Sequence, residues 1–133
     1  MGGLAGRSIL VVEDEMLLAM DIEELVRAAG CTVIGPVGTV SDAMRKLREV
    51  RPDGAILDVN ISGEMVFPIA DALHEAGIPF MIVTGYTREH VPERHRERPF
   101  LQKPYKAAVL VAMLGEMLGN AQRGPNSSHT KSA

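Results

Sequence analysis

The sequence predicts an α/β fold, in which a doubly wound parallel sheet has helices on both of its faces. The first observation behind this prediction is the order of segments, because strand-like apolar runs alternate with amphipathic helical segments five times along the chain. The second is the composition of the runs. They are continuously apolar, as in SILVV at residues 8–12, which is typical of parallel strands buried on both sides.

The first half of the chain contains two strand–helix units. In each unit a short apolar run is followed by apolar residues at helical spacing, and glycine or proline stands where an element should stop. A threonine or serine precedes the second helix, where its side chain can cap the first turn. In order, the elements are a strand at 8–12, a helix from Asp14 to Gly30 with Leu18, Ile22, Leu25 and Ala29 on one face, a strand at 31–34 closed by Gly35-Pro36, and a helix from Thr39 or Ser41 with Val40, Met44, Leu47 and Val50 on one face.

The second half contains three more units, of which one is irregular. Between the last two strands, the segment 88–98 is highly charged and contains Pro92, so we expect one short or irregular helix there. The regular helices again carry apolar stripes. In order, the elements are strands at 54–59, 79–84 and 99–102, a helix with Val66, Ile69, Ala70 and Leu73 that ends near Gly77, and a final helix at 106–118.

One folded domain accounts for this pattern. The 133 residues are 46% hydrophobic and 23% charged, which is typical of a globular domain with its own core. Residues 1–6 are rich in glycine, and residues 120–133 are rich in serine, asparagine and glycine, so both are predicted to be flexible tails. We therefore place the domain at residues 7–119.

Charge and targeting signals narrow the function classes. A net charge of −3 argues against a nucleic-acid partner, since proteins that bind phosphate backbones usually carry a basic excess. No apolar run approaches the roughly 18 residues that span a bilayer, and residues 1–7 lack the apolar stretch of a signal peptide. The one cysteine, Cys31, cannot form an internal disulfide. These features predict a cytoplasmic protein that binds neither nucleic acid nor membrane.

Polar or charged residues follow four of the five predicted strands. In an open parallel sheet, ligands bind beyond the carboxyl ends of the strands, so these residues should share one edge. They are Glu13 and Asp14 after the first strand, Asp58 and Asn60 after the third, Thr84 after the fourth and Lys103 after the fifth. The sequence therefore predicts a site that gathers carboxylates, a hydroxyl and an ammonium group.

The carboxylates of this site need a counter-charge. Two unit charges about 5 Å apart, at an effective dielectric constant of about 20, repel by about 3 kcal/mol, so Glu13, Asp14 and Asp58 would separate or take up protons. A hard divalent cation removes the conflict, and an all-oxygen ligand set suits Mg²⁺. Lys103 adds a positive charge that can pair with Asp58 or with a phosphoryl oxygen. Together these groups are what Mg²⁺-assisted phosphoryl transfer to a carboxylate needs.

In this order the residues resemble the receiver domain of two-component response regulators, over roughly residues 7–119. The motifs that carry the resemblance are the acidic pair Glu13-Asp14, Asp58 within ILDVN, Thr84-Gly85 and Lys103-Pro104. The resemblance implies a flavodoxin-like (βα)5 sheet with strand order 2-1-3-4-5. The segment MIVTGYTREH further resembles stand-alone receivers with a FAT-GUY signature, which implies an atypical or short fourth helix. Ile61-Ser62 departs from the usual Met-Pro after the phosphoacceptor.

The resemblance implies a phosphoryl chemistry for three of these residues. Asp58 would accept a phosphoryl group from the histidine of a sensor histidine kinase or of a histidine phosphotransfer protein. Thr84 would donate its hydroxyl to a phosphoryl oxygen, and Lys103 would form an ion pair. Members of the family usually have a cis peptide bond at Lys103-Pro104, which would aim the lysine into the pocket.

The resemblance also implies a metal site and a switch. The Mg²⁺ ligands would be Glu13, Asp14, Asp58 and the backbone carbonyl of Asn60. On phosphorylation Thr84 would move inward and Phe100 would follow it. The protein would then be a phosphoacceptor in a phosphorelay that switches protein contacts or moves phosphoryl groups, without turning over a separate substrate.

Several alternatives stay open at this point. The chain could be a receiver fragment of a hybrid histidine kinase, a flavodoxin-like cofactor-binding module, a phosphatase with an aspartyl nucleophile, or a pseudo-receiver that serves as a scaffold. The last helix is apolar around much of its circumference, so we also expect a homodimer or partner contact there. Its apolar residues are Val109, Leu110, Val111, Met113, Leu114, Met117 and Leu118.

Overall fold

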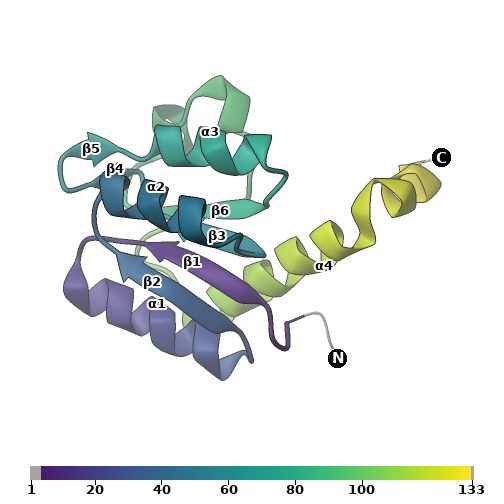
Figure 1. The fold of residues 1–133 in the computed structure, drawn as a ribbon, viewed down its shortest axis with the longest axis horizontal. Coiled ribbons are helices and arrows are strands. Elements are labelled where there is room, and N and C mark those ends of the chain that lie inside the picture. Colours follow the sequence, from purple (N-terminus) through teal and green to yellow (C-terminus); the bar gives the residue numbers. More distant parts are fainter. Residues whose placement is uncertain (1–3, 133) are drawn as a thin grey trace.

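A parallel sheet lies between two layers of helices (Figure 1). The computed structural model describes the backbone of residues 4–132 and the side chains of residues 4–119. The elements are β1 (Ser8–Val12), α1 (Met16–Ala28), β2 (Thr32–Val37), α2 (Val40–Glu49), β3 (Gly54–Leu57), β4 (Asn60–Ile61), β5 (Glu64–Met65), α3 (Phe67–Glu75), β6 (Phe80–Thr84), the 3₁₀ turns Arg88–His90 and Glu93–His95, β7 (Phe100–Gln102) and α4 (Ala107–Ser132).

The main sheet has five strands in the order β2-β1-β3-β6-β7, and each neighbouring pair is parallel. Counted along the chain without the short strands β4 and β5, this is the predicted order 2-1-3-4-5, so the fold prediction is confirmed. The register brings the strand ends level. Val12 pairs with Leu57, and Leu57 pairs with Ile82. The residues after β1 and β3 therefore emerge side by side at one edge of the sheet.

Alternate residues of the strands fill two separate cores. One core joins the sheet to α2 and α3, and the other joins it to α1 and α4, as the layers in Figure 1 show. Because successive strand side chains point to opposite faces, Leu10 and Leu57 enter the first core whereas Ile9 and Ile56 enter the second. This burial on both faces is the physical reason for the continuously apolar strands.

The helices differ from their predicted bounds and faces in detail. The first begins at Met16 rather than Asp14, and its buried residues are Ala19, Ile22 and Val26, so its inner face is rotated by about one residue from the predicted stripe. Thr39 caps α2, accepting a hydrogen bond from the Asp42 N–H at 3.1 Å. The prediction for Val50 is wrong, because it follows α2 and is 44% exposed. The predicted stripe of α3 is confirmed, with Val66, Ile69, Ala70 and Leu73 fully buried.

Two features of the strands were not predicted. β2 extends to Val37 instead of stopping before Gly35, and its pairing with β1 contains an irregularity between Leu10 and Val12. β4 and β5 form a small antiparallel hairpin directly after Asp58. Its turn residues Ser62 and Gly63 both have positive φ, 52° and 85°, as the type I′ two-residue hairpin turn requires.

The connection between β6 and β7, residues 85–99, contains two 3₁₀ turns and no α-helix, so the α-helix that follows β7 is the one labelled α4. This confirms the prediction of an irregular element there. Arginine side chains of this segment donate hydrogen bonds to backbone carbonyls that in a helix would be paired with backbone N–H groups. Arg88 donates to the carbonyl of Arg96 at 2.7 Å, and Arg96 donates to the carbonyl of Val91 at 2.7 Å.

The predicted domain boundaries stay a prediction, although the structure bears on both ends. Leu4 packs against the core that contains α1 and α4, and the N–H of Gly6 donates to the carbonyl of Gly30 at 3.0 Å. At the other end α4 runs to Ser132, and the side chains of the predicted tail lie outside the described residues. Among the described residues, no helix combines the length and apolarity needed to cross a bilayer.

The described part of α4 is buried along one face. Its residues Leu110, Leu114, Met117 and Leu118 are buried against the sheet and α1. Val109 is 41% exposed. The homodimer contact through this helix stays a prediction.

Candidate functional site

The ammonium group of Lys103 joins two carboxylates at the carboxyl edge of the sheet. Its Nζ lies 2.9 Å from Oδ2 of Asp58 and 3.1 Å from Oε1 of Glu13. The three side chains are well shielded, with exposed fractions of 19% for Lys103, 12% for Asp58 and 2% for Glu13. The backbone N–H of Lys103 donates to the carbonyl of Thr84 at 2.8 Å, and the Lys103-Pro104 bond is cis, as the resemblance implies.

Asp14 completes the acidic group from a more exposed position. Its Oδ2 accepts a hydrogen bond at 2.7 Å from the N–H of Ser62, in the turn of the β4–β5 hairpin. The Ser62 hydroxyl in turn donates to the carbonyl of Gly38 at 2.7 Å. The hairpin therefore fixes the first acidic pair relative to the strand that carries Asp58. Sequence reasoning missed this role of Ser62, and the turn-forming dipeptide Ser62-Gly63 was the available signal.

The three carboxylates fit a small hard cation. Oxygen atoms of Glu13, Asp14 and Asp58 all lie within 4.8 Å of one another. Ligand oxygens around one Mg²⁺ are separated by about 3–4 Å, so a small closure of these side chains would suffice. The donor set is purely oxygen, which suits Mg²⁺ better than a softer transition metal.

Asn60 lies next to this group but uses its side chain elsewhere. Its Oδ1 accepts from the N–H of Gly63 at 3.0 Å, and its Nδ2 donates to the hydroxyl of Tyr86 at 3.2 Å. The proposed role of Asn60 concerns only the backbone carbonyl, so these contacts leave it a prediction. Tyr86 is a residue that sequence reasoning did not assign to the site, and it links the hairpin to the β6–β7 connection.

Thr84 and Phe100 stand at the two ends of the β6–β7 connection. Thr84 is 1% exposed, and its hydroxyl accepts a hydrogen bond from the N–H of Tyr86 at 3.3 Å. Within the described residues this hydroxyl makes no hydrogen bond to Asp58 or to the side chain of Lys103. Phe100 is partly buried, and the guanidinium of Arg88 lies over its ring at 4.8 Å from the centroid. Their switch roles stay predictions.

Burial and pairing set the charges of the site. Burial raises the pKa of Glu13, against the opposing effects of the Glu15 N–H and of Lys103. Burial alone would lower the pKa of Lys103, but its hydrogen bonds with Asp58 and Glu13 outweigh this effect and raise that pKa. Lys103 is therefore cationic throughout the neutral range. The raised pKa of Glu13 means that the cluster of acidic side chains favours a bound proton or another positive charge.

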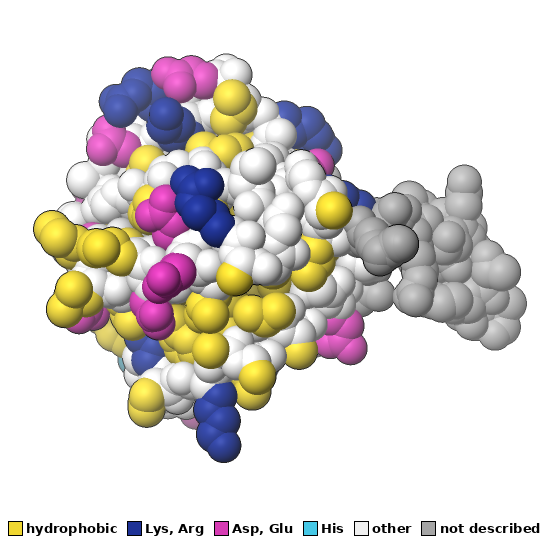
Figure 2. Space-filling model, turned by 90° about the horizontal axis from the view of Figure 1, so that it is seen from below, with side chains coloured by type: hydrophobic (Ala, Val, Ile, Leu, Met, Phe, Trp, Pro, Cys, Tyr) yellow, Lys and Arg dark blue, Asp and Glu magenta, His cyan; other side chains and the backbone are white. Residues whose placement is uncertain are grey.

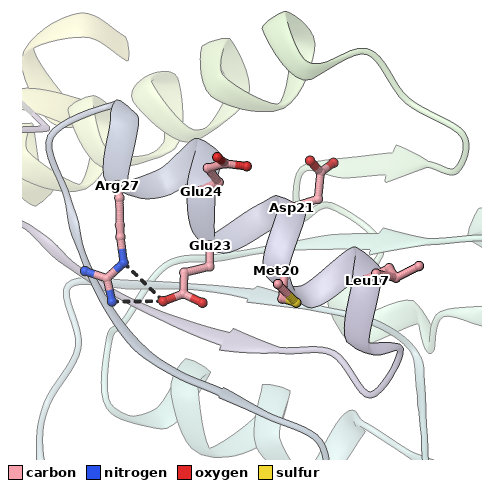
Figure 3. Close-up of a pocket in the computed structure, with 6 residues that line it drawn as sticks. All are labelled: Leu17, Met20, Asp21, Glu23, Glu24 and Arg27. Atoms are coloured by element: carbon pink, nitrogen blue, oxygen red, sulfur yellow. Dashed lines mark hydrogen bonds and ion pairs between the residues drawn. The ribbon is translucent and has the colours of Figure 1, made fainter.

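The outer face of α1 carries exposed apolar residues beside the site. Met16, Leu17 and Met20 are 72%, 76% and 57% exposed. Leu17 and Met20 line a shallow hollow of about 440 Å³, together with the polar residues shown in Figure 3, in which Glu23 and Arg27 are joined at 2.9 Å. Figure 2 shows this side of the molecule, with apolar side chains among acidic ones. Exposed large apolar side chains that lie close together can form a surface that meets another protein.

Comparison with known proteins places the chain in a family. Residues 9–115 match the family model described as "Response regulator receiver domain". The chain is 32% identical over 114 residues to the phyllosphere-induced regulator PhyR of Methylorubrum extorquens, covering 83% of this chain and 43% of PhyR. It is 28% identical over 109 residues to the transcriptional regulatory protein PdtaR of Mycobacterium tuberculosis, covering 79% and 53%. It thus spans about half the length of these curated relatives.

A solved structure matches over almost its full length. The solution structure of SdrG from Sphingomonas melonis Fr1 superposes with a TM-score of 0.75 at 39% sequence identity, covering 89% of this chain and 99% of SdrG. The receiver domain of Erythrobacter litoralis PhyR superposes with a TM-score of 0.78 at 24% identity, which supports the fold alone.

Proposed function

The chain belongs to the response regulator receiver domain family, and from this premise we propose that it accepts a phosphoryl group on Asp58. The observation that carries the proposal is the shared edge at which Asp58, Glu13 and Asp14 meet the ammonium of Lys103. A buried strand that ends in a carboxylate held by a cation suits a nucleophile for phosphorus. The donor would be the phosphohistidine of a sensor histidine kinase or of a histidine phosphotransfer protein.

In the proposed step an oxygen of Asp58 attacks the phosphorus of the phosphohistidine. The new O–P bond forms as the N–P bond breaks, and the electron pair of that bond returns to the imidazole nitrogen of the donor. Lys103 balances the negative charge on the phosphoryl oxygens, and Thr84 donates its hydroxyl to one of them. Such transfers depend mainly on positioning and charge neutralisation.

Glu13, Asp14, Asp58 and the backbone carbonyl of Asn60 would hold Mg²⁺, which would supply further positive charge beside the phosphoryl oxygens when bound. The sequence at the site also argues against two rival functions. A flavodoxin-like module needs phosphate-binding groups after β1, where this chain has Glu13, Asp14 and Glu15. A phosphatase with an aspartyl nucleophile would want a second Asp where Asn60 stands.

The exposed face of α1 suits docking of the phosphodonor protein. Met16 and Leu17 begin the helix two to four positions after the acidic pair, so a protein bound there also reaches the edge that holds Asp58. The acidic side chains around Leu17 and Met20 would favour a partner with basic residues near its histidine. Output would follow by protein contact or by onward phosphoryl transfer, and a cytoplasmic location fits these partners.

The test is incubation with acetyl phosphate and Mg²⁺, followed by intact mass measurement. The wild-type chain should gain the mass of one phosphoryl group, and Asp58→Asn should gain none. Asp53→Asn is the matched control, since Asp53 precedes the same strand at its opposite end, and it should behave as wild type. A wild-type chain that stays unmodified, or an Asp58→Asn variant that is modified equally, would refute the proposal.

A further inference from the structure

The β6–β7 connection, residues 85–99, is held together as one body by its own side chains. Arg88 donates to the carbonyls of Arg96 and Arg98 at 2.7 and 3.3 Å. Arg96 donates to the carbonyls of Val91 and Glu89 at 2.7 and 3.3 Å. These bonds cross between the two 3₁₀ turns, so the turns cannot move independently. Arg88 and Arg96 therefore have a structural role within this segment.

One carboxylate of α3 fastens this body to the rest of the domain. Asp71 accepts two hydrogen bonds from Arg94, from Nε at 2.8 Å and from Nη2 at 3.0 Å. It also accepts one from Nε2 of His95 at 2.7 Å. We call these three contacts the Asp71 latch. A neighbouring contact, from Arg98 Nη2 to His74 Nδ1 at 2.8 Å, joins the same two elements.

The burial of His95 gives the latch its strength. An exposed arginine–carboxylate pair alone contributes little, but His95 is 2% exposed and packs edge-on against Phe80 at 5.5 Å between ring centroids. Its Nδ1 has no hydrogen-bond partner among the described residues, so the Nε2–H is the ring's polar contact. If the connection moved away from α3, this buried N–H would lose its acceptor, which is costly.

The connection that the latch holds joins the two predicted switch residues. Thr84 ends β6 and Phe100 begins β7, so they are the residues on either side of the connection. Each is also tied to it directly, Thr84 by the N–H of Tyr86 and Phe100 by the guanidinium of Arg88. An inward shift of Thr84 or a rotation of Phe100 would therefore displace the connection, which the latch keeps against α3.

We propose that Asp71 is a positioning residue for the phosphoacceptor site: through Arg94 and His95 it holds the β6–β7 connection against α3 and so favours the resting placement of Thr84 and Phe100. This inference rests on the proposed function, because it concerns how readily the site passes to its phosphorylated arrangement. Packed connections of this kind have discrete placements rather than a continuum. Removing the latch shifts the population toward the phosphorylated placement.

The test compares Asp71→Ala with wild type in two measurements. Backbone amide exchange should become faster across residues 85–99. Phosphorylation by acetyl phosphate and Mg²⁺, followed by intact mass, should become about five-fold faster, since a coupling of ordinary size is removed. The matched control is Asp42→Ala, whose carboxylate also pairs with an arginine and is 40% exposed against 45% for Asp71. It should change neither measurement.

A second variant separates release of the latch from loss of the fold. His95→Phe keeps a ring against Phe80 but removes the N–H that needs Asp71, so it should also speed both processes in a folded protein. Equal or slower phosphorylation in Asp71→Ala and His95→Phe, or exchange no faster than in Asp42→Ala, would overturn the proposal. A wild-type chain that takes no phosphoryl group would refute the proposed function, and the exchange comparison would still decide whether the latch exists.

Discussion

Lys103 and Asp58 are 45 positions apart in the chain, yet Nζ of the lysine lies 2.9 Å from Oδ2 of the aspartate. The parallel register explains the meeting, because β7 and β3 are separated only by β6 and all three end at the same edge. The same ammonium group also pairs with Glu13, which follows β1 on the other side of β3. One cation therefore offsets two shielded carboxylates, and the third acid, Asp14, has no such partner among the described residues.

Replacing this lysine should slow phosphorylation far more than it affects the fold. Lys103→Met removes the charge that balances the phosphoryl oxygens, and loss of one such stabilising group typically costs about 100-fold in rate. The time course of mass gain with acetyl phosphate and Mg²⁺ measures this. Lys106→Met, which removes an exposed lysine nearby, should keep the wild-type rate. Equal rates for the two variants would show that Lys103 has no part in the transfer.

Magnesium should stabilise the folded chain through the acidic group. An ion that binds only the folded state at 100 times its Kd adds about 2.7 kcal/mol, which corresponds to a rise in Tm of about 5 °C or more. Asp14→Asn removes one of the three carboxylates and should reduce the rise. Differential scanning fluorimetry with MgCl₂, against NaCl of equal ionic strength, measures it. A rise that is the same in both salts would argue against a specific site.

The buried and the exposed apolar residues of α1 should differ in how much they contribute to the free energy of unfolding. Ile22 is 1% exposed, so Ile22→Ala should lower the free energy of unfolding by about 2–5 kcal/mol. Leu17 is 76% exposed, so Leu17→Ser should change it by no more than about 0.5 kcal/mol. Urea denaturation measures both. If Leu17→Ser were as costly as Ile22→Ala, Leu17 would serve the fold, and the docking role proposed for its face would lose its support.

The sequence was informative where one physical pattern dominates. Burial on both faces requires continuous apolar strands, so the order and type of the sheet strands were predictable, and with them the shared edge of Asp58 and Lys103. The charged segment with Pro92 correctly indicated that a regular fourth helix would not form.

The remaining features depend on contacts between distant residues. Nothing local in the sequence says that the Ser62 N–H will meet Asp14, or that Arg94 and His95 will meet Asp71 on α3. The exposure of Val50 is of the same kind, since it depends on where the end of α2 lies relative to the sheet. Charged residues in an irregular segment have too many available partners for their pairing to be predicted from spacing alone.

The stability contributed by Asp71 should depend on pH. Its hydrogen bonds with Arg94 and then His95 lower its pKa from 3.8 to about 2 in the folded chain. A lowered folded-state pKa means that the carboxylate stabilises the fold fully above the unfolded pKa and that this contribution is lost as the pH falls toward 2.

Asp71→Asn should therefore be less stable than wild type at pH 7, by about 1 kcal/mol once solvent screening of this partly exposed side chain is included. The deficit should narrow as the pH falls from about 4 toward 2, because the carboxylate of the unfolded wild-type chain takes up a proton in this range before that of the folded chain does, which lowers the stability of the wild type. Urea denaturation at a series of pH values from 7 to 3 measures the difference. Asp42→Asn is the control, since its carboxylate pairs with Arg45 on the surface of α2 without a buried partner. A deficit for Asp71→Asn that stays constant over this range would mean that its charge contributes nothing, and that the His95 N–H needs only a neutral acceptor.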